Sequence, residues 1–315
     1  MLGSALIRQY ANGARVSPEV AGQDIVLHYA LALLNERGLI GRPPDGGPPG
    51  PPGPLLFKGG TALRKCVFGS LGRFSEDIDL DAERKNGFEA EIEELFQREY
   101  HGLRFHFANI RYSDEENFSG TVEYAHEHGQ GTFELQISYR MTIVLPTVDL
   151  PLAPTPYQAR VECGIPVLHG LDPYEMIAEK IMACGRRLKG SGKDVYDLGL
   201  WASRPFDETL ARRLAVLKAW TDRRRGNPYN PEALLAAIVP GNFRWTDLKG
   251  LVPRNQTDRV AEQAKICTTV RTRFASLSQL EPDEEALLAD QTSHREVSLF
   301  ERLSEEAREM RRHLG

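Results

Sequence analysis

One segment, residues 58–80, constrains the fold of this chain more than any other: KGGTALRKCVFGSLGRFSEDIDL. It joins a Gly-Gly-Thr turn to an Asp-x-Asp pair within one supersecondary unit. We predict that residues 55–57 form a helix end or a buried turn and that residues 74–80 form a strand. Because side chains alternate faces along a strand, the carboxylates of Asp77 and Asp79 point the same way while the apolar residues beside them enter the core.

The spacing of these groups suits the binding of metal and phosphate. Two carboxylates about 7 Å apart along a strand can hold one or two divalent ions, and hard cations such as Mg²⁺ prefer carboxylate oxygen. Asp77 and Asp79 are therefore the expected metal ligands. The glycine turn offers backbone N–H groups to phosphate, and the helix N-terminus that follows adds a favourable dipole. The candidate phosphate-binding residues are Lys58, Gly59, Gly60, Thr61, Arg73 and Ser75.

Two sequence blocks resemble a known family. KGGTAL followed by RFSEDIDL is similar to the signature of the DNA polymerase β-like nucleotidyltransferases, and in particular of the AbiEii-type toxins, which include the MenT toxins. A later block agrees with this family in content and order. It consists of an AEK helix that contains Lys180 and a KDVYDL segment that contains Asp194 and Asp197. The resemblance extends over roughly residues 20–200.

The resemblance implies an α+β fold in which a polymerase β-like domain with a mixed sheet precedes a mainly α-helical domain. It implies a toxin that uses Mg²⁺ to transfer nucleotides, pyrimidines in particular, from an NTP to the 3′ end of tRNA, which blocks aminoacylation and translation. The implied partners are the NTP, the tRNA acceptor stem and a cognate antitoxin protein. Two other functions stay open: transfer to a protein or small-molecule acceptor, and a non-catalytic module that binds nucleotide or antitoxin.

The resemblance also implies roles for individual residues. Lys180 would reach the triphosphate, and one acid of the KDVYDL segment would be essential, with Asp194 and Asp197 both open. Polymerase β-like sites usually add a third carboxylate from a later strand, and Gln136 stands at the position expected to be acidic. Either Glu134, on the same face of that strand, replaces it, or the proton of the acceptor passes to water.

Charge and hydropathy narrow the partners and the compartment. The net charge of −5 gives no general attraction to nucleic acid, but residues 185–225 contain eleven Lys or Arg against five Asp or Glu. That excess predicts an electropositive face for the acceptor stem, and a solvated helix surface is the alternative.

The chain has no 18-residue apolar run and no secretory signal pattern, so we expect a cytoplasmic protein without a membrane span. The four cysteines lack the CxxC spacing of a zinc site.

The pattern of apolar residues and breakers divides the chain into two expected domains. Residues 1–170 would form the nucleotidyltransferase domain, with N-terminal helices and an exposed Pro/Gly-rich loop at 42–54. Residues 171–315 would form the helical domain that contributes Lys180 and the basic segment. Helices are expected within 5–38, at 88–100 and from 172 onward, strands at 103–112, 119–126, 132–145 and 161–168, and a proline-rich turn at 149–156.

Overall fold

The computed structural model divides into two compact units, each described here by itself. It describes residues 2–41, 53–82, 87–113, 117–139, 142–164, 167–186, 190–222, 228–252 and 260–314. Unit 1 comprises Met1–Met141, Thr147–Leu171 and Gly250–Pro253, and unit 2 comprises Thr142–Pro146, Asp172–Lys249 and Arg254–Gly315. Most of the expected loop at 42–54 lies outside the described residues. The assignment of functions to a 1–170 and a 171–315 domain stays a prediction.

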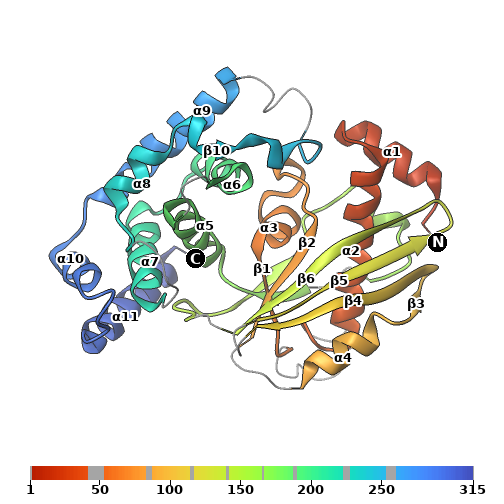
Figure 1. Ribbon diagram of the computed structural model, residues 1–315, viewed down its shortest axis with the longest axis horizontal. Helices are drawn as coiled ribbons and strands as arrows, with labels where there is room; N and C mark the ends of the chain where they lie inside the picture. Colours follow the sequence, from red (N-terminus) through yellow and green to blue (C-terminus); the bar gives the residue numbers. More distant parts are fainter. Residues whose placement is uncertain are drawn as a thin grey trace. The chain divides into compact units, whose positions relative to one another are not determined.

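Unit 1 is built on an eight-stranded mixed sheet with the strand order β3-β4-β5-β6-β2-β1-β8-β7 (Figure 1). The strands are β1 Leu56–Lys58, β2 Asp77–Asp81, β3 Glu99–Tyr100, β4 Leu103–Ser113, β5 Asn117–His126, β6 Gly129–Ser138, β7 Val148–Pro151 and β8 Val167–Gly170. Two pairs, β2 with β6 and β1 with β8, are parallel, and the other pairs are antiparallel. The predicted α+β class with a mixed sheet is confirmed.

Several predicted boundaries in unit 1 are wrong. Residues 55–57 are not a helix end, because 56–58 form the buried strand β1, whose three residues are too short to show a period. The strand expected at 132–145 ends at Ser138, and the strand expected at 161–168 begins only at Val167. The turn expected at 149–156 begins with strand β7, and the helix expected at 88–100 ends at Leu95 because Glu99–Tyr100 pair with β4.

Helix α2, Pro18–Glu36, passes through the core of unit 1. Ser17 caps it by accepting a hydrogen bond from the Val20 N–H at 3.4 Å, and Pro18 occupies its first turn, as helix starts favour. Apolar residues surround the helix on every side, and nearly all of its side chains from Ala21 to Asn35 are buried. A helix that is apolar all round must be covered all round, so α2 is an internal support for the elements packed on it.

The other helices of unit 1 are short. They are α1 Ser4–Ala14, α3 Gly59–Ala62, which continues directly as a π-helix at Leu63–Phe68, and α4 Phe88–Leu95, with 3₁₀ turns at Gly69–Leu71 and Gln158–Arg160. Aromatic rings join α4 to the sheet: Phe96, directly after the helix, lies 5.5 Å from the ring of Phe105 and 6.1 Å from that of Phe133. Edge-to-face pairs of this kind fix the orientation of the rings as well as burying apolar area.

A buried polar network fastens the π-helix to α2. The Lys65 ammonium lies 3.1 Å from Asp24 Oδ1 and donates to the Asp24 carbonyl at 2.9 Å. Hydroxyl groups of Tyr10 and Tyr157 donate to Asp24 Oδ2 at 2.9 and 3.2 Å, and Lys65 donates to the Tyr157 hydroxyl at 3.1 Å. Each polar group therefore has a partner, as burial of an ion pair requires.

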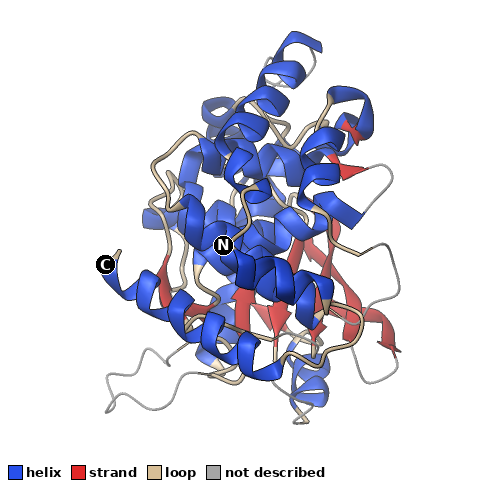
Figure 2. Ribbon diagram, turned by 90° about the vertical axis from the view of Figure 1, so that its left-hand side faces the viewer, coloured by secondary structure: helices blue, strands red, loops and turns tan. Residues whose placement is uncertain are grey.

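Unit 2 is mainly helical, and Figure 2 shows helices in blue and strands in red. The helices are α5 Pro173–Arg186, α6 Gly192–Ala202, α7 Glu208–Thr221, α8 Pro231–Ala237, α9 Val260–Arg273, α10 Pro282–Ala289 and α11 Val297–His313. A parallel pair of short strands, β9 Gly190–Ser191 and β10 Phe243–Arg244, and 3₁₀ turns at Pro240–Asn242, Trp245–Leu248 and Ala275–Ser278 complete the unit. Within the described part of the chain, no helix is long and apolar enough to cross a membrane.

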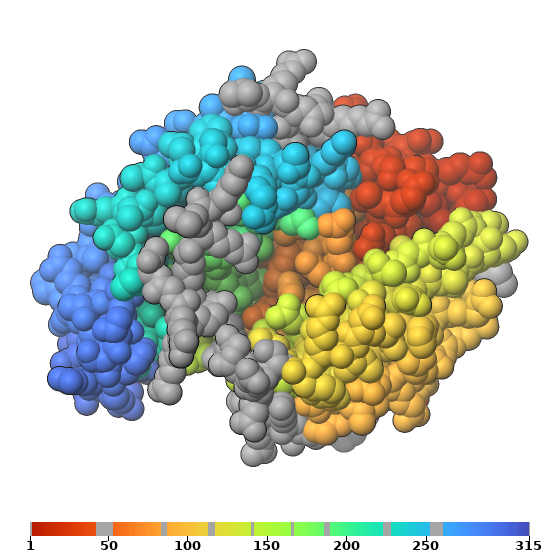
Figure 3. Space-filling model, in the orientation of Figure 1, coloured from red at the N-terminus to blue at the C-terminus, as the bar shows by residue number. Residues whose placement is uncertain are grey.

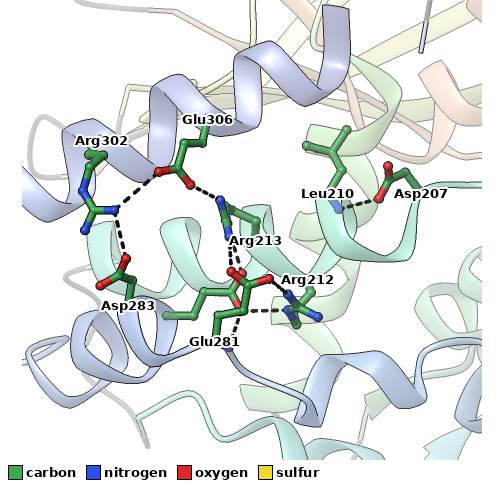
Figure 4. A network of polar contacts seen from close by, with 9 residues as sticks. Asp207, Leu210, Arg212, Arg213, Glu281, Asp283, Arg302 and Glu306 are labelled. Carbon is green, nitrogen blue, oxygen red and sulfur yellow. Dashed lines mark hydrogen bonds and ion pairs between the residues drawn. The ribbon is translucent and has the colours of Figure 1, made fainter. Parts of the chain in front are cut away.

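A network of charges ties α7 to α10 and α11 (Figure 4). Glu284, whose side chain is fully buried, accepts from Arg212 Nε at 2.7 Å and from Arg213 Nε at 3.1 Å. Arg212 and Arg213 both reach Glu281 at 3.0 Å, and Arg213 also pairs with Glu306. These contacts use most of the charge that α7 contributes to the basic segment.

Among the described residues of 185–225, the predicted electropositive face is therefore smaller than the charge count implies. Besides the two arginines of Figure 4, Lys218 is buried and lies 2.5 Å from Glu175 and 3.5 Å from Glu179. Its neutralising carboxylates come from α5, and those of the arginines come from the last two helices, so the local sequence could not reveal the pairing. The basic residues at 187, 189 and 223–225 lie outside the described residues.

The Asp24–Lys65 pair predicts a component of stability that depends on pH. Burial alone would raise the pKa of Asp24, but the charges of Lys65 and Arg64 hold the pKa below its ordinary value of 3.8. A carboxyl with a lowered pKa in the folded state stabilises that state above its ordinary pKa and loses this contribution as the pH falls through the folded value. In urea titrations, the free energy of unfolding should fall more steeply below about pH 4 in the native protein than in the Asp24→Asn/Lys65→Met variant. Parallel curves would contradict the assignment.

Candidate active site

The pairing of β1 with β2 brings the glycine turn against the Asp-x-Asp strand. Lys58 stands opposite Asp79 in this antiparallel pair, and the chain leaves β1 directly into the helical turn that begins at Gly59. Gly59 has a φ of 78°, and a Cβ there would collide with Asp79 Oδ2 and lie 2.7 Å from Asp79 Cβ. Only glycine combines this backbone conformation with so close an approach of a carboxylate.

Two hydroxyl groups hold Asp77 at the start of β2. Ser75 Oγ donates to Asp77 Oδ1 at 2.7 Å, and Thr61 Oγ1 donates to the Asp77 carbonyl and lies 3.4 Å from Oδ1. Ser75 and Thr61 are buried, whereas Asp77 and Asp79 are partly exposed. The structure therefore brings together the turn and the strand that the sequence singled out, with both carboxylates partly exposed on one face of the sheet.

Arg73 and Gly60 meet at the same place. The Arg73 side chain is buried and donates to the Phe74 carbonyl at 3.2 Å. A Cβ at Gly60 would collide with Arg73 Nη2 and lie 3.1 Å from Ser75 Oγ. A guanidinium beside the backbone of a glycine turn gives this place a positive polarisation, which phosphate oxygens prefer.

Lys58 has an acidic partner that sequence reasoning missed. Its ammonium lies 2.6 Å from Asp81 Oδ1, and both side chains are nearly buried. Asp81 is the third acid in the alternating run DIDLD, so it shares a sheet face with Asp77 and Asp79. The alternation of acids in this run was the signal from which Asp81 could have been predicted as part of the same face. A contact between Lys58 and phosphate has to compete with this ion pair.

Strand β6 lies parallel to β2 and carries the positions expected for a third carboxylate. Glu134 stands opposite Asp77, and Gln136 stands opposite Asp79, with both β6 side chains exposed on the site face. Thr121 Oγ1 on β5 donates to Glu134 Oε1 at 2.7 Å. The strands β4–β6, coloured yellow to yellow-green, reach the molecular surface in Figure 3. Glu134 is thus the carboxylate that the strand register places beside Asp77.

The donor set of the site fits Mg²⁺ with two protein carboxylates. Among the described residues, no group of three or more His, Cys, Asp or Glu side chains could hold a metal ion. Mg²⁺ is commonly held by one or two carboxylates together with water and the oxygens of a substrate phosphate. Asp77 and Asp79 carry hard oxygens of that number, close in the chain to Gly59, Gly60 and Arg73.

The site residues predicted in the second block lie together in unit 2. The Lys180 ammonium on α5 is 2.8 Å from Asp194 Oδ1 and 3.3 Å from Asp197 Oδ2 on α6. The three-residue spacing puts both acids on one helix face, and all three side chains are largely buried. Ser191 caps α6 by accepting from the Lys193 N–H at 3.2 Å, which fixes the start of the helix that carries both acids.

The chain is similar to known proteins in its sequence and its fold. The profile of the family described as nucleotidyl transferase AbiEii toxin, type IV toxin–antitoxin system, matches residues 50–290. Two solved proteins from Helicobacter pylori, a putative nucleotidyltransferase and JHP933, are each 20% identical to the chain with TM-scores of 0.48; they cover 84% and 88% of it and match over 99% of their own lengths. A search of curated proteins found no significant match.

A further solved structure is similar over almost the whole chain. It is MenT4, a nucleotidyltransferase toxin from Mycobacterium tuberculosis H37Rv, which is 30% identical with a TM-score of 0.80. The similarity covers 98% of this chain and 100% of MenT4. Together with the family profile, which spans both sequence blocks, it shows that the chain belongs to the AbiEii family of nucleotidyltransferase toxins of type IV toxin–antitoxin systems.

Proposed function

We propose that this nucleotidyltransferase uses Mg²⁺ to add nucleotides, pyrimidines in particular, from an NTP to the 3′ end of tRNA, and that it thereby blocks translation until a cognate antitoxin counteracts it. The observation that carries the proposal is the direct approach of the Gly59 backbone to the Asp79 carboxylate. This approach supports the proposal because phosphate bound at the turn and metal bound at the strand would then be neighbours. The choice of tRNA rests on the resemblance of the two sequence blocks to the MenT toxins.

In the proposed reaction, a bond forms between a 3′ hydroxyl oxygen of the acceptor and the α-phosphorus, and pyrophosphate leaves. Backbone N–H groups at 59–61, with Arg73, bind the β- and γ-phosphates and hold the α-phosphorus in line with the acceptor. Asp77 and Asp79 would hold Mg²⁺, which when bound neutralises charge on the attacking and leaving oxygens. Ser75 and Thr61 keep Asp77 oriented. The acceptor proton goes to Glu134 or to water.

The role of Lys180 rests on the resemblance of its sequence block to the family, since a triphosphate has to compete with the two carboxylates at its ammonium. Asp194 and Asp197 both lie within 3.3 Å of the Lys180 nitrogen, so they fix its position from two sides. We propose that Lys180 binds the triphosphate and that both acids position it.

The direct test is to incubate the protein with tRNA, Mg²⁺ and each labelled NTP in turn. The native protein should label tRNA, and Asp77→Asn should reduce the rate by about 100-fold or more because it removes a metal ligand. Glu76→Gln is the matched control, since this acid directly precedes Asp77 but its side chain is exposed.

The same assay separates the alternatives. Label on a protein or small molecule from a lysate, with none on tRNA, would assign a different acceptor. Binding of NTP without transfer to any acceptor would indicate a module that binds nucleotide without turnover. Equal rates for Asp77→Asn and the native protein would refute the assigned site.

A second prediction concerns the contact between Gly59 and Asp79. Gly59→Ala should lower the transfer rate by about ten- to a hundredfold, because the new methyl group displaces the carboxylate. Gly87→Ala introduces the same backbone strain, since Gly87 has a φ of 81°, but its Cβ would meet nothing within 4 Å. Steady-state kinetics should show near-native transfer by Gly87→Ala. A similar loss in both variants would mean that backbone strain, and not the displaced carboxylate, is responsible.

A third prediction separates the two roles of Lys180. Lys180→Met removes the cation between Asp194 and Asp197, so it should lower the melting temperature and reduce transfer by about 100-fold. Adding Asp197→Asn relieves the repulsion between the acids and should recover part of the stability without recovering activity. Melting curves and transfer rates of both variants check this. Recovery of activity by the double variant would show that Lys180 serves only to neutralise the acids.

A further inference from the structure

One turn of the buried helix α2 contacts the chain segments that carry the candidate site. Gln23 and Asp24 are consecutive residues in this turn. Asp24 holds Lys65 in the π-helix that continues from the glycine turn. Gln23 Nε2 donates to the Thr132 carbonyl at 3.1 Å and lies 3.5 Å from the Glu76 carbonyl. The same turn of α2 therefore reaches the helix after β1, the entry to β2 and the early part of β6.

The contact between Asp24 and Lys65 fixes the position of the glycine turn along the axis of the helix that follows it. Lys65 lies four residues after Thr61, about one helical turn, so its position along the helix axis determines where the backbone N–H groups at 59–61 point. Its ammonium is held by three oxygens: the Asp24 carboxylate, the Asp24 carbonyl and the Tyr157 hydroxyl. Charge-assisted hydrogen bonds from several directions leave the helix little freedom to slide.

Arg64, the neighbour of Lys65, holds the loop that connects the π-helix to β2. It donates to the carbonyls of Gly69 and of Gly72, the latter at 2.9 Å, and to the Tyr10 hydroxyl at 3.2 Å. Its guanidinium lies 4.4 Å from the ring centre of Phe74. The loop that leads from the helix to Ser75 is therefore attached to the same network as Asp24.

Gln23 contacts the entry to β2, which carries Asp77 and Asp79, and strand β6, which carries Glu134. Glu76 directly precedes Asp77, and Thr132 stands two residues before Glu134. A side-chain amide that links these two carbonyls sets the entry to β2 and the Thr132 position of β6 at a defined separation. The pairing of Asp77 with Glu134 begins immediately after that link.

We propose that Gln23, Asp24 and Lys65 are positioning residues for nucleotidyl transfer: α2 uses them to set the phosphate-binding turn and the carboxylate strands relative to each other. The inference rests on the proposed function of the turn and the strands. Stability alone does not account for a buried ion pair, because well-packed apolar residues of similar volume are often as stable. A pair with fixed geometry instead specifies one position of the helix.

Two mild variants test the proposal, since both should fold. Tyr157→Phe removes the hydroxyl that bonds to both Lys65 and Asp24, and Gln23→Ala removes the link between the strands. Tyr157→Phe should raise the KM for NTP by about tenfold, and Gln23→Ala should lower kcat by about tenfold, because small displacements of reacting groups are costly. Hydrogen exchange of the amides in residues 59–68 should become faster in Tyr157→Phe. The stronger Asp24→Asn/Lys65→Met variant should show the higher KM for NTP and the faster hydrogen exchange of residues 59–68.

Glu284→Gln is the control, because it breaks a buried ion-pair network in unit 2 that contains no candidate site residue. It should lower the melting temperature while leaving KM, kcat and the exchange of residues 59–68 unchanged. If Tyr157→Phe and Gln23→Ala also change only the melting temperature, the network is merely structural and the proposal is wrong. If the native protein transfers no nucleotide, the proposed function fails. Hydrogen exchange still shows in that case whether α2 fixes the turn.

Discussion

The pairing of the three-residue strand β1 with β2 is the constraint on which the site depends. It places Lys58 opposite Asp79 and turns the chain sharply at Gly59, so that peptide N–H groups and a carboxylate share a space too small for a side chain. Phosphate and metal sites carry opposite demands: one needs positive polarisation and the other needs negative charge. Here the glycine turn and the carboxylate strand are direct neighbours. An NTP with its metal would satisfy both at once, as the proposed function of this strand pair requires.

The same arrangement creates an electrostatic problem that neighbouring residues relieve. β2 presents three acids on one face, and carboxylates at this spacing repel one another when no cation is bound. Lys58 neutralises Asp81 directly, and hydroxyl groups of Ser75 and Thr61 stabilise Asp77 without adding charge. The ion pair thus cancels the charge at the buried end of the strand, whereas Asp77 and Asp79 lie at its partly exposed end. In unit 2 two acids, Asp194 and Asp197, surround the single ammonium of Lys180.

The sequence predicts the local features of the site well and the long-range ones poorly. Alternation along DIDL correctly predicts Asp77 and Asp79 on one face with Ile78 and Leu80 in the core, because that pattern is set by the strand itself. The pairing of Lys58 with Asp81 and the hydrogen bond from Thr121 to Glu134 depend on which strands become neighbours. No local period encodes that choice. The basic segment misled for the same reason: the acids that bury Arg212 and Arg213 come from helices about seventy to ninety residues later.

The anchoring of the glycine turn has a consequence for synthesis of the protein. Lys65 and Asp24 are 41 residues apart, but the hydroxyl that completes their network belongs to Tyr157, which is 133 residues after Asp24. A nascent chain that already carries the glycine turn and both carboxylates still lacks this third contact, and it also lacks Lys180. A ribosome that makes this protein has therefore synthesised about half of its 315 residues before Tyr157 can complete the network. Premature termination before Tyr157 leaves the turn without its complete anchor.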